Sequence, residues 1–75
     1  MTENEIIGFI NERLRLPWSL SEYRLGKKID VDWAWGRVIN AVLPKYKEKG
    51  WQITKNVITD GDYRCLFLTF KNDQL

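Results

Sequence analysis

Two pairs of aspartates are the residues whose spacing could support metal binding or acid–base chemistry. Asp30 and Asp32 lie two residues apart at the expected start of a helix, so their side chains diverge. Each can instead accept a hydrogen bond from a first-turn N–H and meet the positive end of the helix dipole. Asp60 and Asp62 flank Gly61 in an expected exposed turn, where two carboxylates form no cation cage. We therefore interpret both pairs as structural and predict no metal site.

Nucleophilic catalysis lacks its usual residues. The chain has no histidine, which removes the usual general base near neutral pH, Ser–His and Cys–His pairs and histidine metal ligands. Its one cysteine, Cys65, falls in an expected strand, where a small half-buried side chain is a better explanation than a nucleophile. The five glycines are scattered and form no phosphate-binding loop. We therefore expect a protein that is not an enzyme and that uses no cofactor.

Length and apolar content restrict the class of protein. Seventy-five residues predict a single domain, 1–75, with a modest core. No apolar run is long enough to cross a membrane, and the start of the sequence lacks a signal-peptide pattern. A single cysteine forms no internal disulfide, which fits a reducing compartment. We expect a cytoplasmic protein with no membrane partner.

Charge is unevenly distributed along the chain. Residues 1–23 carry four acidic and two basic side chains, whereas residues 24–71 carry ten basic and five acidic side chains. Such a basic region could favour an anionic partner, or its lysines could only keep an exposed helix face soluble. Because nucleic-acid-binding domains are usually more basic, the second interpretation is the simpler one, and nucleic acid stays an alternative partner.

The element expected to position a binding site is a long helix of about 31–49. Apolar residues recur at helical spacing on one stripe: Val31, Trp35, Val38, Ile39, Val42 and Tyr46. Gly50 suits the left-handed position just past a helix end, and Trp51 would pack back against Tyr46. Pro44 removes one helical hydrogen bond, so we expect a kink there or a helix in two parts.

A β-hairpin is expected after this helix, with strands of about 51–58 and 63–70. Asp60-Gly61 is a preferred two-residue turn, because both positions take positive φ. Placing these two residues at the tip pairs Ile53 with Leu68. The helix-facing side then comprises Trp51, Ile53, Lys55, Val57, Arg64, Leu66, Leu68 and Phe70. The other side is mixed and rich in aromatic residues.

Two capping boxes predict shorter helices before the long one. They pair Thr2 with Glu5 and Ser19 with Glu22. The first opens a helix of about 3–15, and the second opens a helix of about 20–25 that Gly26 can end. Residues 27–29 would lead into the long helix. The chain therefore predicts an α+β fold, with two or three helices followed by a C-terminal antiparallel β-hairpin.

Binding is the function that these residues leave open. The long helix would carry Trp33, Arg37, Asn40 and Lys47 opposite its apolar stripe, where Arg37 could lie over the Trp33 ring. Either the first helix or the link at residues 17–18 covers Trp33, or Trp33 faces a partner.

The outer hairpin face could extend this surface. Tyr63 and Phe67 lie on it, either covered by the first helix or forming an interface with a partner or a second copy. The predicted partner-binding residues are Trp33, Arg37, Asn40, Lys47, Tyr63 and Phe67. A protein is the first choice of partner, nucleic acid is the alternative, and a homodimer is a further option.

The order of the expected elements resembles that of a winged-helix domain. Ser19-Leu-Ser-Glu-Tyr-Arg-Leu-Gly26 is similar to its second helix. Lys47-Glu-Lys-Gly50-Trp51 is similar to the turn from a recognition helix into the wing. The resemblance covers most of the chain and implies a nucleic-acid-binding regulator. In that case, the contacts to DNA would come from Arg37, Lys47, Lys55 and Arg64.

Residues 42–70 also resemble small phage-encoded accessory proteins. In many of these α+β domains a helix ends in a Tyr-Lys-x-x-Gly-Trp segment, as at Tyr46 to Trp51. A hairpin then ends in an aromatic-rich strand, as in Leu66-Phe67-Leu68-Thr69-Phe70. Such proteins commonly bind a host protein, often as inhibitors. This resemblance implies a small non-enzymatic protein that binds and modulates or inhibits a host protein, which is our first hypothesis.

Overall fold

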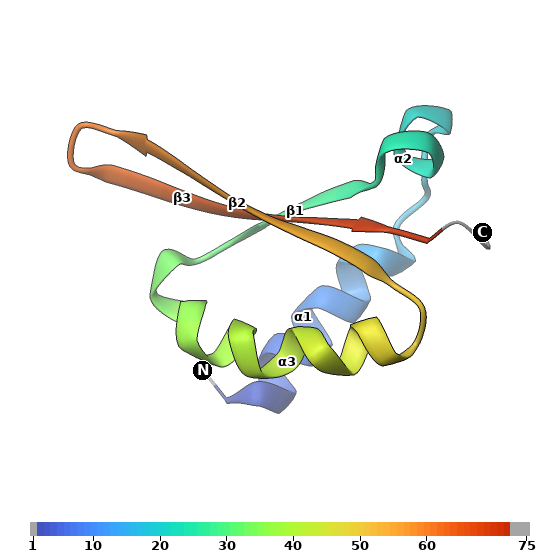
Figure 1. Ribbon diagram of the computed structural model, residues 1–75, viewed down its shortest axis with the longest axis horizontal. Coiled ribbons are helices and arrows are strands. Elements are labelled where there is room, and N and C mark those ends of the chain that lie inside the picture. The colour runs from blue at the N-terminus through green and yellow to red at the C-terminus, as the bar shows by residue number, and fades with distance from the viewer. Residues whose placement is uncertain (1, 73–75) are drawn as a thin grey trace.

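The computed structural model describes residues 2–72 and contains helices followed by a three-stranded antiparallel sheet (Figure 1). The helices are α1 (Glu3–Arg15), α2 (Leu20–Leu25), the 3₁₀ helix η1 (Trp33–Trp35) and α3 (Gly36–Glu48). The strands are β1 (Lys27–Val31), β2 (Gln52–Asp60) and β3 (Tyr63–Lys71). The predicted α+β class and C-terminal hairpin are confirmed.

Two predictions concern residues that the structure does not describe. An apolar contact between Met1 and Ile6 is expected from the capping box of α1, and the polar tail after Lys71 is expected to fray. Met1 and residues 73–75 lie outside the described residues. Within residues 2–72, no helix combines the length and the apolar composition that crossing a membrane requires.

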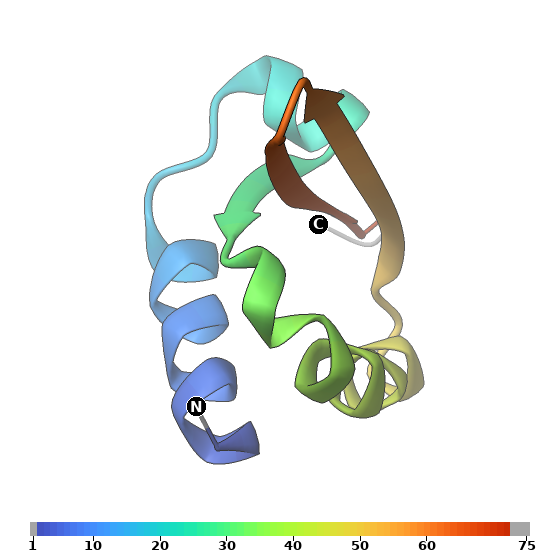
Figure 2. The same ribbon diagram turned by 90° about the vertical axis from the view of Figure 1, so that its left-hand side faces the viewer.

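The sheet has the strand order β1-β3-β2, so the last strand along the chain lies in its centre. In Figure 1, α1 and α3 lie below the sheet and the tip of the hairpin extends beyond them, whereas α2 lies at the opposite end of the sheet. Figure 2 shows α1 and α3 side by side beneath the strands. The helices therefore cover one face of the sheet, and the tip of the hairpin has no helix beside it.

One hydrophobic core lies between these two layers. Alternate residues of β1 and β3 point into it and meet one side of α1 and of α3. Its buried members are Ile6, Ile10, Ile29, Val31, Ile39, Val42, Leu43, Tyr46, Leu66, Leu68 and Phe70. The Tyr46 hydroxyl donates a hydrogen bond of 2.8 Å to Asn11 Oδ1, which ties α3 to α1. The Tyr46 and Phe70 rings pack edge to face with centroids 5.4 Å apart.

The predicted long helix of about 31–49 is wrong at its N-terminal end. Residues 27–31 form β1 and pair with β3, and α3 begins only at Gly36. Ile29 and Val31 are buried two residues apart, the spacing of a strand, and lie opposite Leu68 and Leu66. Pairing with a strand far along the chain therefore outweighs the helical spacing of Val31 with later residues.

The C-terminal end of α3 has the predicted form. The N–H of Gly50 donates to the Lys47 carbonyl at 3.1 Å, and the N–H of Trp51 donates to the Tyr46 carbonyl at 3.2 Å. These two bonds and the positive φ of Gly50, 97°, define a Schellman motif. The helix is continuous through Pro44, so of the two expected alternatives, a kink or a helix in two parts, the second is wrong.

The hairpin register differs by two residues from the prediction. Ile53 pairs with Phe70 instead of Leu68, and the turn residues are Gly61 and Asp62 instead of Asp60-Gly61. Gly61 has φ 61°, and glycines are the only residues with positive φ within residues 2–72, so Asp62 has negative φ. This combination fits a type II′ turn, in which only the first central residue has positive φ. A shift of two leaves every side chain on its predicted face, because side chains alternate with a period of two.

Both predicted capping boxes are confirmed. Thr2 Oγ1 accepts a hydrogen bond from the Glu5 N–H at 3.2 Å, and Ser19 Oγ accepts one from the Glu22 N–H at 3.2 Å. Each glutamate in turn accepts a hydrogen bond from the backbone N–H of its partner. These caps set the first residues of α1 and α2 where the sequence places them.

Candidate binding surface around Trp33

Trp33 is held by the short helix that joins β1 to α3. Asp32 Oδ1 accepts a hydrogen bond from the Ala34 N–H at 2.9 Å, and the Asp32 carbonyl accepts one from the Trp35 N–H at 3.0 Å. The two tryptophans of η1 have different surroundings. Trp35 packs on Phe9 of α1 with ring centroids 5.4 Å apart, whereas Trp33 keeps 44% of its surface exposed. The first helix therefore packs on Trp35 and leaves Trp33 partly in solvent.

A groove on one side of Trp33 lies between the N-terminal turn of α3 and β2. Its volume is about 450 Å³, and it is lined by Trp33, Ala34, Gly36, Arg37, Asn40, Lys55, Val57 and Leu66. We call it the α3–β2 groove. Val57 and Leu66 pair across the two strands and give it an apolar floor. Its polar lining comes from Arg37 and Asn40 on α3 and from Lys55 on β2.

Two cationic side chains line this groove, and a third lies against the Trp33 ring. Arg37 and Lys55 line it, and the guanidinium carbon of Arg64 lies 5.4 Å from the centroid of the Trp33 ring. Lys55 Nζ donates a hydrogen bond of 2.9 Å to Asn40 Oδ1. None of the three cations forms an ion pair with another residue of the described part of the chain, and no carboxylate lines the groove. The groove is therefore a compact site of positive charge beside an aromatic ring.

A second hollow, of about 340 Å³, lies on the other side of Trp33. It is lined by Asp30, Val31, Asp32, Trp33, Tyr63, Arg64, Cys65, Leu66 and Phe67. A hydrogen bond with Cys65 raises the pKa of the Tyr63 phenol, and electrostatic interactions with Cys65 and with Asp30 act in the same direction. Tyr63 therefore stays a neutral hydroxyl at physiological pH. Trp33 forms the ridge between this hollow and the α3–β2 groove.

The structure brings five of the six predicted site residues together in two groups. Trp33, Arg37 and Asn40 line the α3–β2 groove, and Tyr63 and Phe67 share the second hollow with Trp33. Lys47 lines neither, because it follows Asn40 by two helical turns, a rise of about 10 Å along α3. The prediction that Arg37 lies over the Trp33 ring is not met, since the cation found there is Arg64.

The predicted set omits three residues that complete the surface, namely Lys55, Val57 and Arg64. All three lie on the predicted helix-facing side of the hairpin, which the shift in register leaves unchanged. The signal in the sequence is the presence of two charged residues, Lys55 and Arg64, on a mostly apolar face. A cation on such a face needs an anion, an aromatic ring or solvent opposite it.

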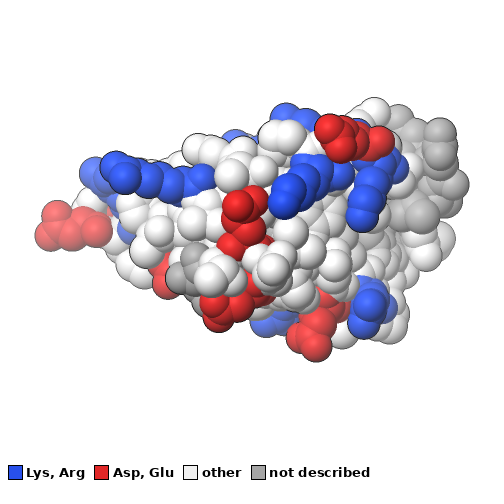
Figure 3. Space-filling model, turned by 90° about the horizontal axis from the view of Figure 1, so that it is seen from below, with Lys and Arg blue, Asp and Glu red and all other residues white. Residues whose placement is uncertain are grey.

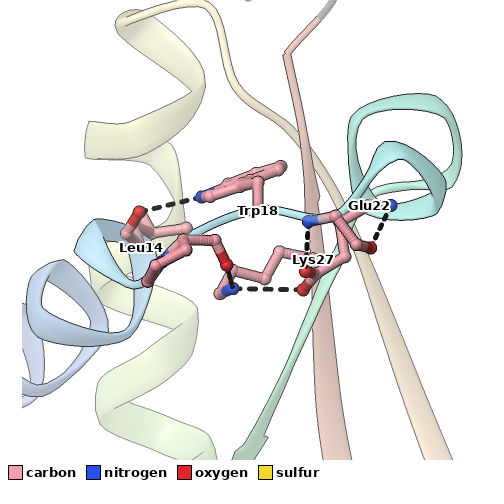
Figure 4. Close-up of polar contacts among 6 residues, drawn as sticks. Leu14, Trp18, Glu22 and Lys27 are labelled. Atoms are coloured by element: carbon pink, nitrogen blue, oxygen red, sulfur yellow. Dashed lines mark hydrogen bonds and ion pairs between the residues drawn. The ribbon is translucent and has the colours of Figure 1, made fainter.

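A second polar cluster lies beside α2, where the link before α2 passes β1 (Figure 4). Lys27 keeps only 7% of its surface exposed. Its Nζ donates to Glu22 Oε2 at 3.1 Å and to the Pro17 carbonyl at 3.4 Å, and it lies 5.4 Å from the centroid of the Trp18 ring. Trp18 Nε1 donates to the Leu14 carbonyl at 2.9 Å. Each donor of this Lys27 cluster has a partner within the chain, so its role is to hold the link and α2 against β1.

Comparison of the chain with protein-family models, with curated proteins and with solved structures found no match. Across the part of the chain that the structure describes, no three histidine, cysteine, aspartate or glutamate side chains are grouped so that they could hold a metal ion. The surface around Trp33 is therefore the candidate functional site of this chain.

Proposed function

We propose that the protein is a small non-enzymatic binding domain that binds and modulates, or inhibits, another protein through the surface around Trp33. The observation that supports this proposal is a partly exposed tryptophan between two hollows, with the guanidinium of Arg64 over its ring. Tryptophan and arginine are the residues most enriched where protein interfaces concentrate their binding energy. A host protein of the kind bound by phage accessory proteins is the partner we favour.

The ordered backbone around Trp33 supports this role. Backbone and capping hydrogen bonds of η1 fix its position, and α3 follows without a loop. A preorganised side chain loses less conformational entropy when a partner binds than a side chain on a mobile loop does. The binding energy of the ring is therefore available to the complex.

The exposed apolar residues of the hairpin add contact area beside Trp33. Val57, Ile58 and Tyr63 keep 45%, 52% and 68% of their surfaces exposed. Val57 lines the α3–β2 groove and Tyr63 lines the second hollow, so both lie beside Trp33, and Ile58 follows Val57 in β2. Apolar side chains gathered next to an exposed tryptophan are typical of an interaction surface.

Substitution of the surface tests the proposal. The partner is captured from extracts of the source cells with wild type, with a Trp33→Ala/Arg37→Ala double variant and with Lys47→Ala, and its affinity is then measured with purified proteins. We expect the double variant to lose the partner and Lys47→Ala to retain it, because Lys47 lies outside both hollows. Unchanged circular dichroism of the double variant provides the folding control. Equal affinity of wild type and the double variant would contradict the proposal.

A winged-helix-like nucleic-acid-binding regulator is the second candidate. The concentration of Arg37, Lys55 and Arg64 around the Trp33 ring favours it, because bases stack on aromatic rings and phosphates bind cations. Affinity for a duplex or a single strand should then fall log-linearly with salt concentration. Titration of both at several salt concentrations tests this candidate. Absence of binding at about 10 mM salt, where non-specific electrostatic binding is strong, would remove it.

A further inference from the structure

We infer that the segment of the partner protein that occupies the α3–β2 groove is acidic, with carboxylates at Arg37, Lys55 and Arg64 and an apolar side chain on the groove floor. This inference rests on the proposed function and names the chemistry of the partner for the same surface. Its occupant is a stretch of polypeptide in which acidic residues flank one apolar residue.

The charges of the groove carry the inference. Arg37 and Lys55 line the groove, which has no carboxylate among its lining residues, and Arg64 reaches the Trp33 ring from the second hollow, which Asp30 and Asp32 also line. None of the three cations forms an ion pair within residues 2–72. Two other bases form ion pairs, since Lys27 lies 3.1 Å from Glu22 and Lys45 lies 3.4 Å from Glu3 of α1. Like charges held together repel, and bound carboxylates would replace that repulsion with attraction.

The N-terminal end of α3 adds to the same potential. Gly36 and Arg37 are the first two residues of this helix, and both line the groove. The N-cap residue, Trp35, has no side chain that accepts a hydrogen bond from the first turn. The nearest carboxylate along the chain, Asp32, caps η1 and not α3, so it offsets only part of the positive end of the helix dipole, and the remainder favours an anion in the groove.

The floor of the groove accounts for the apolar part of the segment. Val57 and Leu66 lie side by side in β2 and β3, and the Trp33 ring stands beside them. A volume of about 450 Å³ is within the range of sites that bury a ligand group. One apolar side chain placed here would be flanked by Arg37 and Lys55, with Arg64 across the Trp33 ring. The spacing of charge around an apolar floor therefore favours a peptide over a free inorganic anion.

A short acidic segment fits this surface better than a nucleic-acid backbone does. The positive charge of the groove covers only a small area, because acidic residues lie on both sides of it. Asp30 and Asp32 line the second hollow across Trp33, and Asp60 and Asp62 flank Gly61 at the hairpin tip. On the face formed by the helices, Figure 3 shows acidic side chains interspersed among the basic ones. A duplex usually contacts a longer continuous basic surface, which the carboxylates near the groove interrupt.

Peptide titration followed by NMR tests the inference on the intact chain. The first probe is acetyl-Asp-Glu-Leu-Glu-Asp-amide, and the matched control is acetyl-Asn-Gln-Leu-Gln-Asn-amide, which has the same length and the same leucine. The indole N–H signal of Trp33 is assigned by its loss in Trp33→Phe. We expect the acidic peptide to shift this signal saturably, and the neutral peptide to bind at least about tenfold more weakly, since each lost charged contact costs a large part of the affinity.

Variants of the protein provide the matching controls. Arg37→Gln and Lys55→Gln keep long polar side chains but remove charge, and each should weaken the acidic peptide several-fold. Lys47→Gln on the same helix lies outside the groove and should leave the affinity unchanged. Raising the salt concentration from about 20 to about 300 mM should weaken the acidic peptide and leave the neutral peptide nearly unaffected.

Four outcomes would overturn the inference. The first is equal shifts from both peptides, and the second is full affinity of the acidic peptide for an Arg37→Gln/Lys55→Gln double variant. The third is tighter binding of a DNA oligonucleotide than of the acidic peptide at the same salt concentration. The fourth is a concentration-dependent dimer, seen by sedimentation, that shifts the Trp33 signal without peptide, because the groove would then hold a second copy.

The inference and the proposed function can fail separately. If Trp33→Ala/Arg37→Ala loses the captured partner but the contacting segment of that partner has no acidic residues, only the inference is wrong. If the partner binds the double variant as it binds wild type, the proposed function of the surface is wrong, whatever the peptides do.

Discussion

Lys27 Nζ donates a hydrogen bond of 3.1 Å to Glu22 Oε2, which joins the first residue of β1 to α2. We expect Lys27→Met to lower the thermal unfolding midpoint, because it leaves the carboxylate and the Pro17 carbonyl without this donor. Lys49→Met, at an exposed position, is the matched control and should change little. Thermal melts followed by circular dichroism measure both. A Lys27→Met protein as stable as wild type would show that the Lys27 cluster adds no net stability.

Glu22 should also make stability depend on pH. Hydrogen bonds from the Ser19 N–H and from Lys27 lower the pKa of this carboxyl below its ordinary value of 4.5. The unfolded chain therefore binds the proton more readily, so the charged carboxylate stabilises the fold above pH 4.5. This contribution is lost as the pH falls through the lower pKa of the folded state.

Urea unfolding of wild type and Glu22→Gln between pH 7 and pH 3 measures this effect. Glutamine keeps an oxygen that can accept the capping hydrogen bond, so the comparison isolates the charge. Wild type should be the more stable protein at pH 7, and the difference should shrink below pH 4.5. Glu12→Gln, at an exposed position with no ion pair within residues 2–72, is the control. A difference that stays constant with pH would argue against the charge.

The same substitution at two glycines should have opposite effects. Gly26 has φ 102° and ψ 158°, a conformation that is essentially restricted to glycine. A Cβ there would lie 2.7 Å from Thr69 Cγ2 and 3.0 Å from the Phe70 carbonyl oxygen. We expect Gly26→Ala to cost more than the strain alone, which is about 1–3 kcal/mol. Gly8→Ala, inside α1 with no atom within 4 Å of the added Cβ, should stabilise by about 0.5–1 kcal/mol.

Denaturant unfolding of the two glycine variants gives both values. Thr69→Ala should recover only part of the loss in Gly26→Ala, because the carbonyl contact and the backbone strain remain. If Gly26→Ala and Gly8→Ala proved equally stable, the contact between the end of α2 and β3 would not have the form described.

The two faces of the hairpin should respond differently to truncation. Leu68 is fully buried between Ile29 and Lys55 of the neighbouring strands, so Leu68→Ala should cost about 2–5 kcal/mol. Thr54 lies exposed on the opposite face, and Thr54→Ala should change stability by no more than about 0.5 kcal/mol. Urea midpoints measure both variants. The reverse order of stabilities would mean that the strand faces are exchanged.

The sequence predicts best those features that a few neighbouring residues determine. The capping boxes at Thr2 and Ser19 and the helix end at Gly50 are such features, and the structure shows all three. The hairpin faces are also correct although the register is off by two, because an alternating pattern depends on even or odd position and not on the turn type.

The features that the sequence does not reveal depend on distant partners. Strand β1 forms because it pairs with β3, in which Phe70 lies opposite Lys27 and Leu66 lies opposite Val31. The two strands are about forty residues apart in the sequence. The surroundings of Trp33 are another case. Placed on a long helix of about 31–49, this residue would stand one turn from Arg37. In the structure it lies in η1 between β1 and α3, and its ring meets Arg64 of the hairpin instead.

The central position of β3 determines the time at which the sheet can form. During synthesis β1 emerges before β2, yet these two strands share no hydrogen bonds, and each pairs only with β3. Neither Ile29 nor Ile53 therefore has a sheet partner until residues 63–71 have left the ribosome. The helices can form as they emerge, but the apolar faces that β3 covers stay exposed until then. A nascent chain halted before Tyr63 would thus be a target for chaperones and proteases, although most of its residues are already made.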